Sequence, residues 1–494
     1  MKIRHLPIDT YPENTAFLTR TGQAYSPEQF KALRTIRIFA GKAEILATLA
    51  LVDDGELLEN DEIGLGEQAF RRLGLPEGAE VEVQQARPPA SLESVRRKID
   101  GETLSDSEVK DIIADIAEHR YSPMEIGAFL VACAGFMSTQ ETLALTNAMI
   151  AVGQRFHWDS RLVVDKHCIG GIPGNRTSMI VVPIVAAHGL LIPKTSSRAI
   201  TSPSGTADTM EVLANVELSG TQIVGIVARE KALLSWGGKV ELSPADDILI
   251  SVERPLRIDT HEQMVASILS KKVAAGSTHL VLDIPVGPTA KVRSQQDAVR
   301  LRKIFEYVAR HLGLTTEVVI SDGSQPVGRG IGPVLEARDV MAVLHNEDDA
   351  PQDLREHALV LAGKVLDFDP ELEGGRGYAR ALELLASGAA LAAMERLIEA
   401  QGRQKQQFPL GVHQKEIAAE RDGKVDAIDC ERIARIARLA GAPMDKGAGI
   451  DLFHKVGARV RAGEALYRIH ANSKTGLRFA CELASETSGY TIVR

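Results

Sequence analysis

A run of polar residues at positions 194–208 is the feature of this chain best suited to chemistry. It reads Lys-Thr-Ser-Ser-Arg-Ala-Ile-Thr-Ser-Pro-Ser-Gly-Thr-Ala-Asp and holds seven hydroxyl side chains, one lysine and one arginine. It directly follows an apolar run at positions 179–193, which we expect to be buried core. Hydroxyls, backbone N–H groups and fixed cations are the groups that bind an anion such as phosphate. The run is therefore a candidate anion-binding loop, the alternative being a serine-rich surface linker.

A second polar loop, rich in glycine, precedes the same apolar run at positions 165–178. It reads Asp-Lys-His-Cys-Ile-Gly-Gly-Ile-Pro-Gly-Asn-Arg-Thr-Ser and follows a strand-like run at positions 161–164. Glycines let a backbone approach a ligand, and the N-terminus of a following helix favours negative charge. The spacing matches neither a Walker A motif nor G-x-G-x-x-G, and a tight turn would look the same. Because the two loops flank one buried segment, together they favour a single site for phosphate or a phosphorylated ligand.

A third segment, residues 257–272, places an acid at the start of a predicted helix. Thr260 begins a capping-box pattern, so Asp259 lies just before the helix N-terminus. Further along, Ser267 and Lys271 are four residues apart and share one helical face. These groups could contact a polar ligand, but a solvated amphipathic helix is the simpler explanation when the segment is considered alone.

A fourth segment, residues 321–336, is another glycine-rich turn between a strand-like run and a helix. It could line a pocket, and close packing of loops explains it equally well. The 13 histidines show no H-E-x-x-H pattern and no spacing typical of a metal site. We therefore expect no metal cofactor.

Length, charge and cysteine usage exclude several classes of protein. At 494 residues the chain is too long for one core, so several domains are expected. The formal net charge of -9 argues against a globally basic surface for a nucleic acid polymer. The four cysteines form no C-x-x-C pair, which argues against structural zinc and disulfides and favours a reducing cytoplasm. With no signal-peptide pattern and no apolar run long enough to span a bilayer, we expect a cytoplasmic protein without a membrane partner.

The order of patterns predicts an α/β multidomain chain. Short alternating apolar runs indicate strands near the N-terminus, three capping-box patterns indicate a helical cluster after them, and strand–loop–helix alternation follows. The predicted parts are an N-terminal β-rich module at 1–86, a helical domain at 91–160 joined by 255–275, an α/β phosphate-binding domain with a mixed sheet at 161–405, and a small C-terminal α+β domain at 406–494.

Three of these stretches resemble the thymidine phosphorylase and AMP phosphorylase family. The resemblance rests on D-K-H-x-I-G-G at 165–171, on K-T-S-S-R-A-I-T-S at 194–202 with G-T-A-D at 205–208, and on A-S-I-L-S-K-K at 266–272. It covers nearly the whole chain and is strongest to the long branch, which includes archaeal AMP phosphorylases and bacterial proteins named as type 2 thymidine phosphorylases. The family cleaves an N-glycosidic bond with inorganic phosphate, giving a free base and a pentose 1-phosphate.

The resemblance implies a role for each matched position. The catalytic residues would be Asp259, which protonates the leaving base, together with Lys166 and Arg198. The attacking phosphate would be held by Lys166, Ser178, Ser196 and Thr206. The nucleoside or nucleotide would contact Gly171, Ser197, Arg198, Ala199, Ile200, Thr201, Ser202, Thr206, Ser267, Lys271 and Lys291.

Elementary chemistry agrees with this assignment. Breaking the glycosidic bond leaves positive charge on the sugar and negative charge on the base. A phosphate held against the sugar face both stabilises that cation and attacks it, while a carboxylic acid near the base supplies a proton. The family closes a cleft between its helical and α/β domains, which would exclude water and favour phosphorolysis over hydrolysis.

Two positions depart from the family pattern. Cys168 stands where many members have serine, and a thiol is the weaker hydrogen-bond donor, so phosphate affinity is expected to be lower. Val252 stands where thymidine phosphorylases carry a base-binding arginine, although Arg254 lies two residues away. The second departure leaves the preference for a pyrimidine base open.

The resemblance further implies a homodimer or higher homo-oligomer, with inorganic phosphate as co-substrate and no cofactor. Thymidine, other pyrimidine nucleosides and the monophosphates AMP, CMP and UMP all stay open as substrates; for a 5′-phosphate, Lys291, Arg198 and Arg257 are candidate partners. One alternative is a phosphoribosyltransferase of related fold, which would need magnesium, and no paired-acid site for it is evident. Another is a non-catalytic nucleotide-binding or carrier protein, but the hairpin-like segment at 456–469 lacks the lysine that a carrier domain needs.

Overall fold

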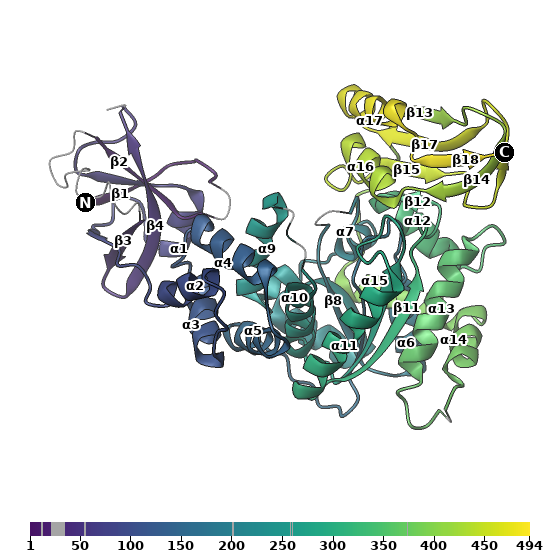
Figure 1. Cartoon of the computed structure of the whole chain (residues 1–494), viewed down its shortest axis with the longest axis horizontal. Coiled ribbons are helices and arrows are strands. Elements are labelled where there is room, and N and C mark those ends of the chain that lie inside the picture. Colours follow the sequence, from purple (N-terminus) through teal and green to yellow (C-terminus); the bar gives the residue numbers. More distant parts are fainter. Residues whose placement is uncertain are drawn as a thin grey trace. The chain divides into compact units, whose positions relative to one another are not determined.

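The computed structural model describes residues 1–10, 13–20, 35–53, 56–199, 202–256, 258, 260–372 and 374–494 (Figure 1). The predicted site residues Ile200, Thr201 and Asp259, together with Arg257, lie outside the described residues. The chain divides into two compact units, a first unit of Met1–Ala148 with Pro244–Thr260 and a second unit of Met149–Ser243 with His261–Arg494. These two units do not correspond one to one with the four predicted domains, whose boundaries stay predictions.

The first unit begins with the predicted β-rich module. Apolar residues alternate with polar ones along its strands, so Ile36, Ile38 and Ile45 are buried on one face in a common core. The short helix α1 packs against β2, β4 and β5. The strand order is β1-β5-β2-β4-β3-β6. The elements are β1 (Lys2–His5), β2 (Thr15–Thr19), β3 (Thr35–Ala40), β4 (Ala43–Val52), β5 (Glu62–Leu65), α1 (Glu67–Leu73) and β6 (Glu82–Gln85).

The predicted helical cluster follows, and its helix starts are where the capping-box patterns place them. Ser105 and Ser122 each accept the backbone N–H of the glutamate three residues on, and that glutamate side chain accepts the serine N–H in return. Ser138 makes the same reciprocal pair at the third start. Helix α9 packs against α3 and α4. The helices are α2 (Leu92–Ile99), α3 (Asp106–Ala117), α4 (Pro123–Gly135), α5 (Thr139–Val152) and α9 (Pro244–Leu256).

The second unit is built on parallel strands. β10 lies between β11 and β7, and β8 pairs with β9, all in parallel. A parallel bridge between Val163 and Leu191 connects the starts of β7 and β8. The strands are β7 (Val164–Cys168), β8 (Ile192–Ser196), β9 (Ala232–Trp236), β10 (His279–Val286) and β11 (Thr315–Asp322).

Helices cover these strands, and one of them is almost wholly buried. The apolar run predicted as core forms α6, in which every residue from 178 to 186 is buried, including Pro183. It packs against α13, α14 and α15. The helices of this part are α6 (Ser178–His188), α7 (Thr206–Met210), α8 (Gly220–Glu230), α10 (His261–Ala274), α11 (Gln295–His311), α12 (Pro333–Leu344), α13 (Gln352–Leu366), α14 (Gly377–Ala386) and α15 (Ala389–Gln401), with a 3₁₀ turn at Gly237–Val240.

The C-terminal part is a small α+β domain that shares a sheet with the α/β part. The short strand β12 (Gly330–Ile331) pairs antiparallel with β15 and completes a sheet of order β12-β15-β17-β13, while β16, β14 and β18 form another sheet. Within the described part of the chain, every helix is too short or too polar to span a bilayer. The elements are β13 (His413–Ala418), β14 (Gly423–Ile428), α16 (Cys430–Ala440), β15 (Gly449–Leu452), β16 (Arg459–Val460), β17 (Ala465–Ala471), α17 (Lys474–Glu486) and β18 (Tyr490–Val493).

Candidate active site

The two polar loops both leave the carboxyl end of a parallel strand. The first loop, residues 165–178, connects β7 to α6, and the second loop, residues 194–208, connects β8 to α7. β7 and β8 run in the same direction from the bridge between Val163 and Leu191. In open α/β sheets the ligand crevice lies outside the carboxyl ends of the strands. The fold therefore places both loops where such a crevice forms.

In the first loop, Lys166 is a buried cation held by a hydroxyl relay. Its side chain is about 1% exposed, and its Nζ donates to Thr177 Oγ1 at 2.7 Å. The Thr177 hydroxyl donates onward to Asn175 Oδ1 at 2.9 Å. An ammonium group has three N–H donors, and Thr177 takes one of them. Ser178, the other predicted phosphate ligand of this loop, is buried at the first position of α6.

Glycine conformations shape the rest of the first loop. Gly170, Gly171 and Gly174 have φ values of +88°, +91° and +74°, which side-chain-bearing residues rarely adopt. A methyl group on Gly171 would lie 2.9 Å from the Lys291 backbone nitrogen, so these two predicted ligand contacts are neighbours. A methyl group on Gly174 would lie only 2.1 Å from the Val327 carbonyl oxygen. The loop is therefore folded by close backbone approach, which glycine alone permits.

Cys168 occupies the end of β7, where its sulfur accepts two hydrogen bonds. Its sulfur lies 3.5 Å from both Gly170 N and Asn175 Nδ2. Burial raises the pKa of the thiol to about 12, with the carboxylate of Asp283 adding to the rise. The thiol is therefore protonated at neutral pH and is neither a thiolate nucleophile nor a strong donor.

The second loop contains an unsatisfied hydroxyl. Ser196 Oγ is buried and has no hydrogen-bond partner among the described residues. A buried hydroxyl without a partner is unfavourable, and a bound anion would satisfy it. Ser196 ends β8, and Thr206 begins α7 at the other end of the loop. Both predicted phosphate ligands of the second loop therefore lie at its two ends.

Asp208 closes the second loop on itself. Its Oδ2 accepts the backbone N–H groups of Ala199 at 2.7 Å and Gly205 at 2.9 Å. Gly205 is packed so tightly that a methyl group on it would lie 2.7 Å from Ser197 O and from Ala199 N. Asp208 is about 3% exposed. A single buried carboxylate thus holds both ends of the intervening turn.

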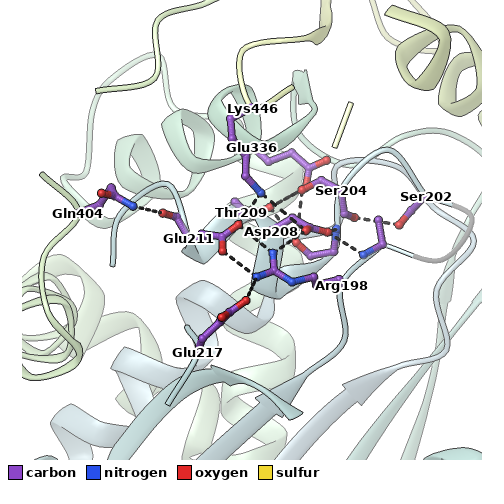
Figure 2. A network of polar contacts seen from close by, with 12 residues as sticks. Arg198, Ser202, Ser204, Asp208, Thr209, Glu211, Glu217, Glu336, Gln404 and Lys446 are labelled. Atoms are coloured by element: carbon purple, nitrogen blue, oxygen red, sulfur yellow. Dashed lines mark hydrogen bonds and ion pairs between the residues drawn. The ribbon is translucent and has the colours of Figure 1, made fainter. Parts of the chain in front are cut away.

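Arg198 is engaged by carboxylates rather than left open to a ligand (Figure 2). Its two terminal nitrogens bind the Glu211 carboxylate at 2.8 and 2.7 Å, and one of them also binds Glu217 at 2.9 Å. Its guanidinium lies 5.0 Å from the centre of the Trp236 ring. Hydrogen bonding from Arg198 lowers the pKa of Glu211 to about 2. In the described conformation Arg198 organises the loop through these carboxylates, and its predicted catalytic and substrate-binding role stays a prediction.

Arg176 joins the two loops, and the sequence analysis assigned it no role. It lies in the first loop, and its Nη1 donates to Thr206 Oγ1 of the second loop at 3.0 Å. Its Nε lies 2.5 Å from Glu336 Oε2 in a buried ion pair. Because the Thr206 oxygen accepts this bond, the Thr206 hydroxyl hydrogen points elsewhere and can be donated to a ligand.

Glu336 anchors this link from α12. It accepts the Gly332 N–H at 3.1 Å and the Thr209 hydroxyl at 3.4 Å. Burial raises the pKa of Glu336 to about 7, although the neighbouring Arg176 acts in the opposite direction. Arg176 and Glu336 both lie inside segments that the sequence singled out. The signal available in the sequence was a charged residue within or beside a glycine-rich loop. The pairing of Arg176 with Glu336 could not be inferred, because the two residues are far apart in the sequence.

Beneath the loops, charged groups are buried at the strand ends. Lys272 Nζ lies 2.7 Å from Asp165 Oδ2, and Lys194 Nζ lies 3.8 Å from Asp165 Oδ1. Burial, reinforced by the charge of Lys272, holds the pKa of Lys194 well below its ordinary value. Burial and the surrounding lysines likewise keep the pKa of His167 well below its usual range. The floor of the site therefore holds a buried ion pair, Lys272 with Asp165, beside Lys194 and His167, whose neutral forms are favoured.

The predicted base-side residues lie on other elements. Ser267 and Lys271 lie half-buried on α10, where the Ser267 carbonyl accepts the Ser270 hydroxyl. Val252, the second departure from the family pattern, and the nearby Arg254 are on α9 of the first unit. On the phosphate side, the structure links the two loops through the hydrogen bond from Arg176 to Thr206. Among described residues, no group of three or more His, Cys, Asp or Glu side chains could hold a metal ion.

The chain matches three protein-family profiles in succession. Residues 92–153 match the helical bundle domain of a glycosyl transferase family, residues 160–391 match the a/b domain of that family, and residues 424–491 match the pyrimidine nucleoside phosphorylase C-terminal domain. The crystal structure of anthranilate phosphoribosyltransferase from Thermus thermophilus is similar in fold, with 21% identity and a TM-score of 0.51 over 62% of this chain and 99% of that one. These matches define the class, a pentosyltransferase with a helical and an α/β domain.

Full-length relatives narrow the class. Proteins named "Putative thymidine phosphorylase" are 58% identical in Rhodopseudomonas palustris strain BisB18 and 56% identical in Methylococcus capsulatus, over 100% of this chain and 96% of each relative. A third, from Bradyrhizobium sp. strain ORS 278, is 56% identical over 100% of this chain and 97% of the relative. The chain belongs to this thymidine phosphorylase family, which confirms the resemblance drawn from its loops.

Proposed function

We propose that the protein cleaves the N-glycosidic bond of a nucleoside with inorganic phosphate, releasing the free base and a pentose 1-phosphate. The names of its relatives favour thymidine, which would give thymine and 2-deoxyribose 1-phosphate. The observation that carries the proposal is the convergence of the two loops. Lys166 is buried within β7, and Ser196 ends the neighbouring parallel strand β8 with a hydroxyl that has no partner among the described residues. Arg176 ties the loops together at Thr206.

The residues divide the reaction as follows. The ammonium of Lys166 and the hydroxyls of Ser178, Ser196 and Thr206 hold the phosphate, with one phosphate oxygen facing C1′ of the pentose. That oxygen forms a bond to C1′ while the bond from C1′ to the base nitrogen breaks. The electron pair of the broken bond leaves with the base. The base then takes a proton, for which Asp259 is the proposed donor. Phosphate close to C1′ stabilises the positive charge that develops on the sugar.

Phosphate serves as co-substrate in this proposal, and neither a metal nor an organic cofactor takes part. The cations that an anionic co-substrate needs are supplied by the chain itself. Lys166 follows Asp165 in the middle of β7, and Lys272 of α10 forms a buried ion pair with Asp165 at 2.7 Å. Phosphate alone, without magnesium, should therefore support turnover, whereas a phosphoribosyltransferase would require diphosphate chemistry and magnesium.

A nucleoside 5′-monophosphate such as AMP is the second candidate substrate. Val252 places an apolar side chain on α9 where a pyrimidine-specific enzyme of the family is expected to carry arginine. The Lys291 backbone lies against Gly171 of the first loop, which makes Lys291 the leading candidate partner of a 5′-phosphate. Base release from AMP would then yield ribose 1,5-bisphosphate.

The test is base release from thymidine, uridine, cytidine, AMP, CMP and UMP, each with and without inorganic phosphate. Phosphate-dependent base release from thymidine supports nucleoside phosphorolysis. Release from the monophosphates alone would instead support phosphorolysis of a nucleoside 5′-monophosphate. Asp259→Asn should lower turnover while leaving ligand binding nearly unchanged. Release that needs magnesium and diphosphate, or no release from any substrate, would overturn both.

We further propose that the protein is a cytoplasmic homodimer formed through the helical part of the first unit. Four large apolar side chains are more than half exposed there: Ile99, Met124, Val131 and Phe136. They border a cavity of about 1110 Å³ between α2, α4 and α9 whose lining is mostly apolar. Monomers rarely expose so continuous an apolar surface, and a second copy can cover it with the same surface.

Light scattering of the full chain tests the dimer. The wild type should have twice the monomer mass, and Val131→Asp should be monomeric at the same concentration, because a charge would be buried in the interface. Val224→Asp, at an exposed valine on α8 of the second unit, is the matched control and should stay dimeric. A monomeric wild type would contradict the proposal.

A further inference from the structure

A lysine of the C-terminal domain reaches the carboxylates that hold the second loop (Figure 2). Lys446 precedes β15, and its side chain is about 14% exposed. Its Nζ lies 2.6 Å from Glu211 Oε2 and 3.8 Å from Asp208 Oδ1. Glu211 is the carboxylate that binds Arg198 with both oxygens, and Asp208 closes the loop backbone. A residue far along the chain therefore contacts the group that sets the shape of the second loop.

Charge explains what Lys446 contributes. The cluster around Arg198 contains three carboxylates, those of Asp208, Glu211 and Glu217, against one guanidinium. Lys446 supplies a second cation, and together with Arg198 it lowers the pKa of Glu211 to about 2. Three carboxylates then face two cations, and without Lys446 the excess of negative charge at the base of the loop would double, which would repel an anion.

The turn that carries Lys446 is fixed by its backbone. The Lys446 carbonyl accepts the Val334 N–H at 3.2 Å, and the Gly447 carbonyl accepts the Gly411 N–H at 2.9 Å. Val334 lies in the first turn of α12, which also carries Glu336. Through Glu336, that helix is connected to Arg176 and thus to Thr206. The same turn therefore supports the C-terminal end of the second loop by two routes, through Glu211 and Asp208 and through Glu336 and Arg176.

We infer that Lys446 is a positioning residue for the attacking phosphate, so the C-terminal domain sets the phosphate affinity of a site built by the α/β part. This inference rests on the proposed phosphorolysis. Lys446 acts through Glu211 and Asp208, whose contacts fix the conformation and charge of the second loop. Its loss should weaken phosphate binding more than nucleoside binding, since the predicted nucleoside contacts at Gly171, Ser267, Lys271 and Lys291 lie outside the second loop.

The experiment compares Lys446→Met with a matched variant of the same domain, Lys455→Met. Lys455 also forms an ion pair with the α/β part, to Asp353 at 2.9 Å, and it donates to the Pro326 carbonyl. Neither partner belongs to the two loops. Phosphate binding to the full chain is measured by calorimetry with inorganic phosphate alone, and KM values for phosphate and nucleoside and kcat are measured separately.

Lys446→Met should weaken phosphate binding and raise the KM for phosphate by about tenfold, because small displacements of positioning groups are costly. The KM for nucleoside should change less than about twofold, Lys446→Arg should restore most of the phosphate affinity, and Lys455→Met should resemble the wild type. Thermal unfolding checks each variant, and Lys446→Gln replaces the methionine variant if that one does not fold.

Equal phosphate affinity in Lys446→Met and Lys455→Met would overturn the inference, as would equal increases in both KM values. The two proposals fail differently. If the wild type binds phosphate but releases no base, the phosphorolysis proposal fails. If the wild type cleaves nucleosides and Lys446→Met binds phosphate normally, only the role of Lys446 fails.

Discussion

The two loops of the site are held in shape by different physical means. The first loop, residues 165–178, depends on backbone conformation, with three glycines at positive φ and Gly174 against the Val327 carbonyl. The second loop, residues 194–208, depends on side-chain charge, with Asp208 clamping its backbone and Arg198 surrounded by carboxylates. A loop built by steric fit allows almost no change of side chain. A loop built by ion pairs responds instead to charge and to pH.

The two loops also differ in which parts of the chain contact them. The partners of the first loop are Glu336 of α12 and the turn that precedes β12, both within the α/β part. The second loop draws on Lys446 of the C-terminal domain as well. Rigid placement of Lys166 and adjustable placement of Ser196 and Thr206 would follow from this division.

The largest effect should come from adding a methyl group to the first loop. Gly174→Ala would force a residue with a side chain to φ +74° and press its Cβ to 2.1 Å from a backbone oxygen. We expect a loss of about 3–5 kcal/mol in unfolding free energy, from left-handed strain together with overpacking. Chemical denaturation measures it.

Gly170→Ala is the matched control for that prediction. Gly170 has φ +88°, but a methyl group there would meet no atom within 4 Å. Only the backbone strain of about 1–2 kcal/mol should appear. Equal losses in the two variants would show that close approach to Val327 does not shape the first loop.

Removing one cation from each loop should distinguish a residue that contacts the phosphate from one that only fixes the conformation of the loop. Lys166→Met should lower kcat/KM for phosphate by roughly 100- to 1,000-fold, because it deletes a charge proposed to contact the anion. Arg198→Met should cost about tenfold, mainly through the KM for phosphate, because Arg198 acts on loop shape through Glu211. Steady-state kinetics with phosphate as the varied substrate distinguishes them, and the reverse order would refute the division of roles.

Glu336 and Glu211, the carboxylates that support the loops, should contribute to the unfolding free energy with opposite dependence on pH. The pKa of Glu336 is raised from 4.5 to about 7, so the folded protein binds this proton more tightly. Its contribution is full below pH 4.5 and is lost as the pH rises through 7. The pKa of Glu211 is lowered from 4.5 to about 2, so its contribution is full above pH 4.5 and is lost as the pH falls towards 2.

Urea unfolding at a series of pH values tests this contrast through the slope of the unfolding free energy against pH. In the wild type, the proton on Glu336 should make the unfolding free energy decline between pH 4.5 and 7. Glu336→Gln should remove this contribution to the decline, even if the substitution also changes the stability at every pH. Glu211→Gln should leave that range unchanged and flatten the acid side instead. Unaltered slopes in both variants would refute the assignment of these protons.

The smallest effect should come from the thiol of the first loop. Cys168→Ser replaces a weak donor with a stronger one beside Gly170 and Asn175 and should lower the KM for phosphate about threefold. Cys481→Ser, a half-buried free cysteine on α17, is the control and should change nothing. A higher KM for phosphate in Cys168→Ser would show that the thiol does not face the anion.

Much of the fold was predictable because its signals are local. The helix starts at Ser105, Ser122 and Ser138 follow from serine and glutamate three residues apart, whose hydrogen bonds need no other part of the chain. The burial of α6 follows from an unbroken apolar run. The fold class and the family were predicted correctly for the same reason, since the motifs that carry them are contiguous.

The sequence by itself was enough to select the two loops as the candidate site, because hydroxyls, cations and glycines concentrate there within a few residues. Only the tertiary structure decided which cations stay available. Arg198 is taken up by Glu211 and Glu217, Lys446 arrives from another domain, and Arg176 is paired with Glu336. Ion pairs between distant segments depend on distances of a few ångströms, and such distances exist only once the strands and helices have packed.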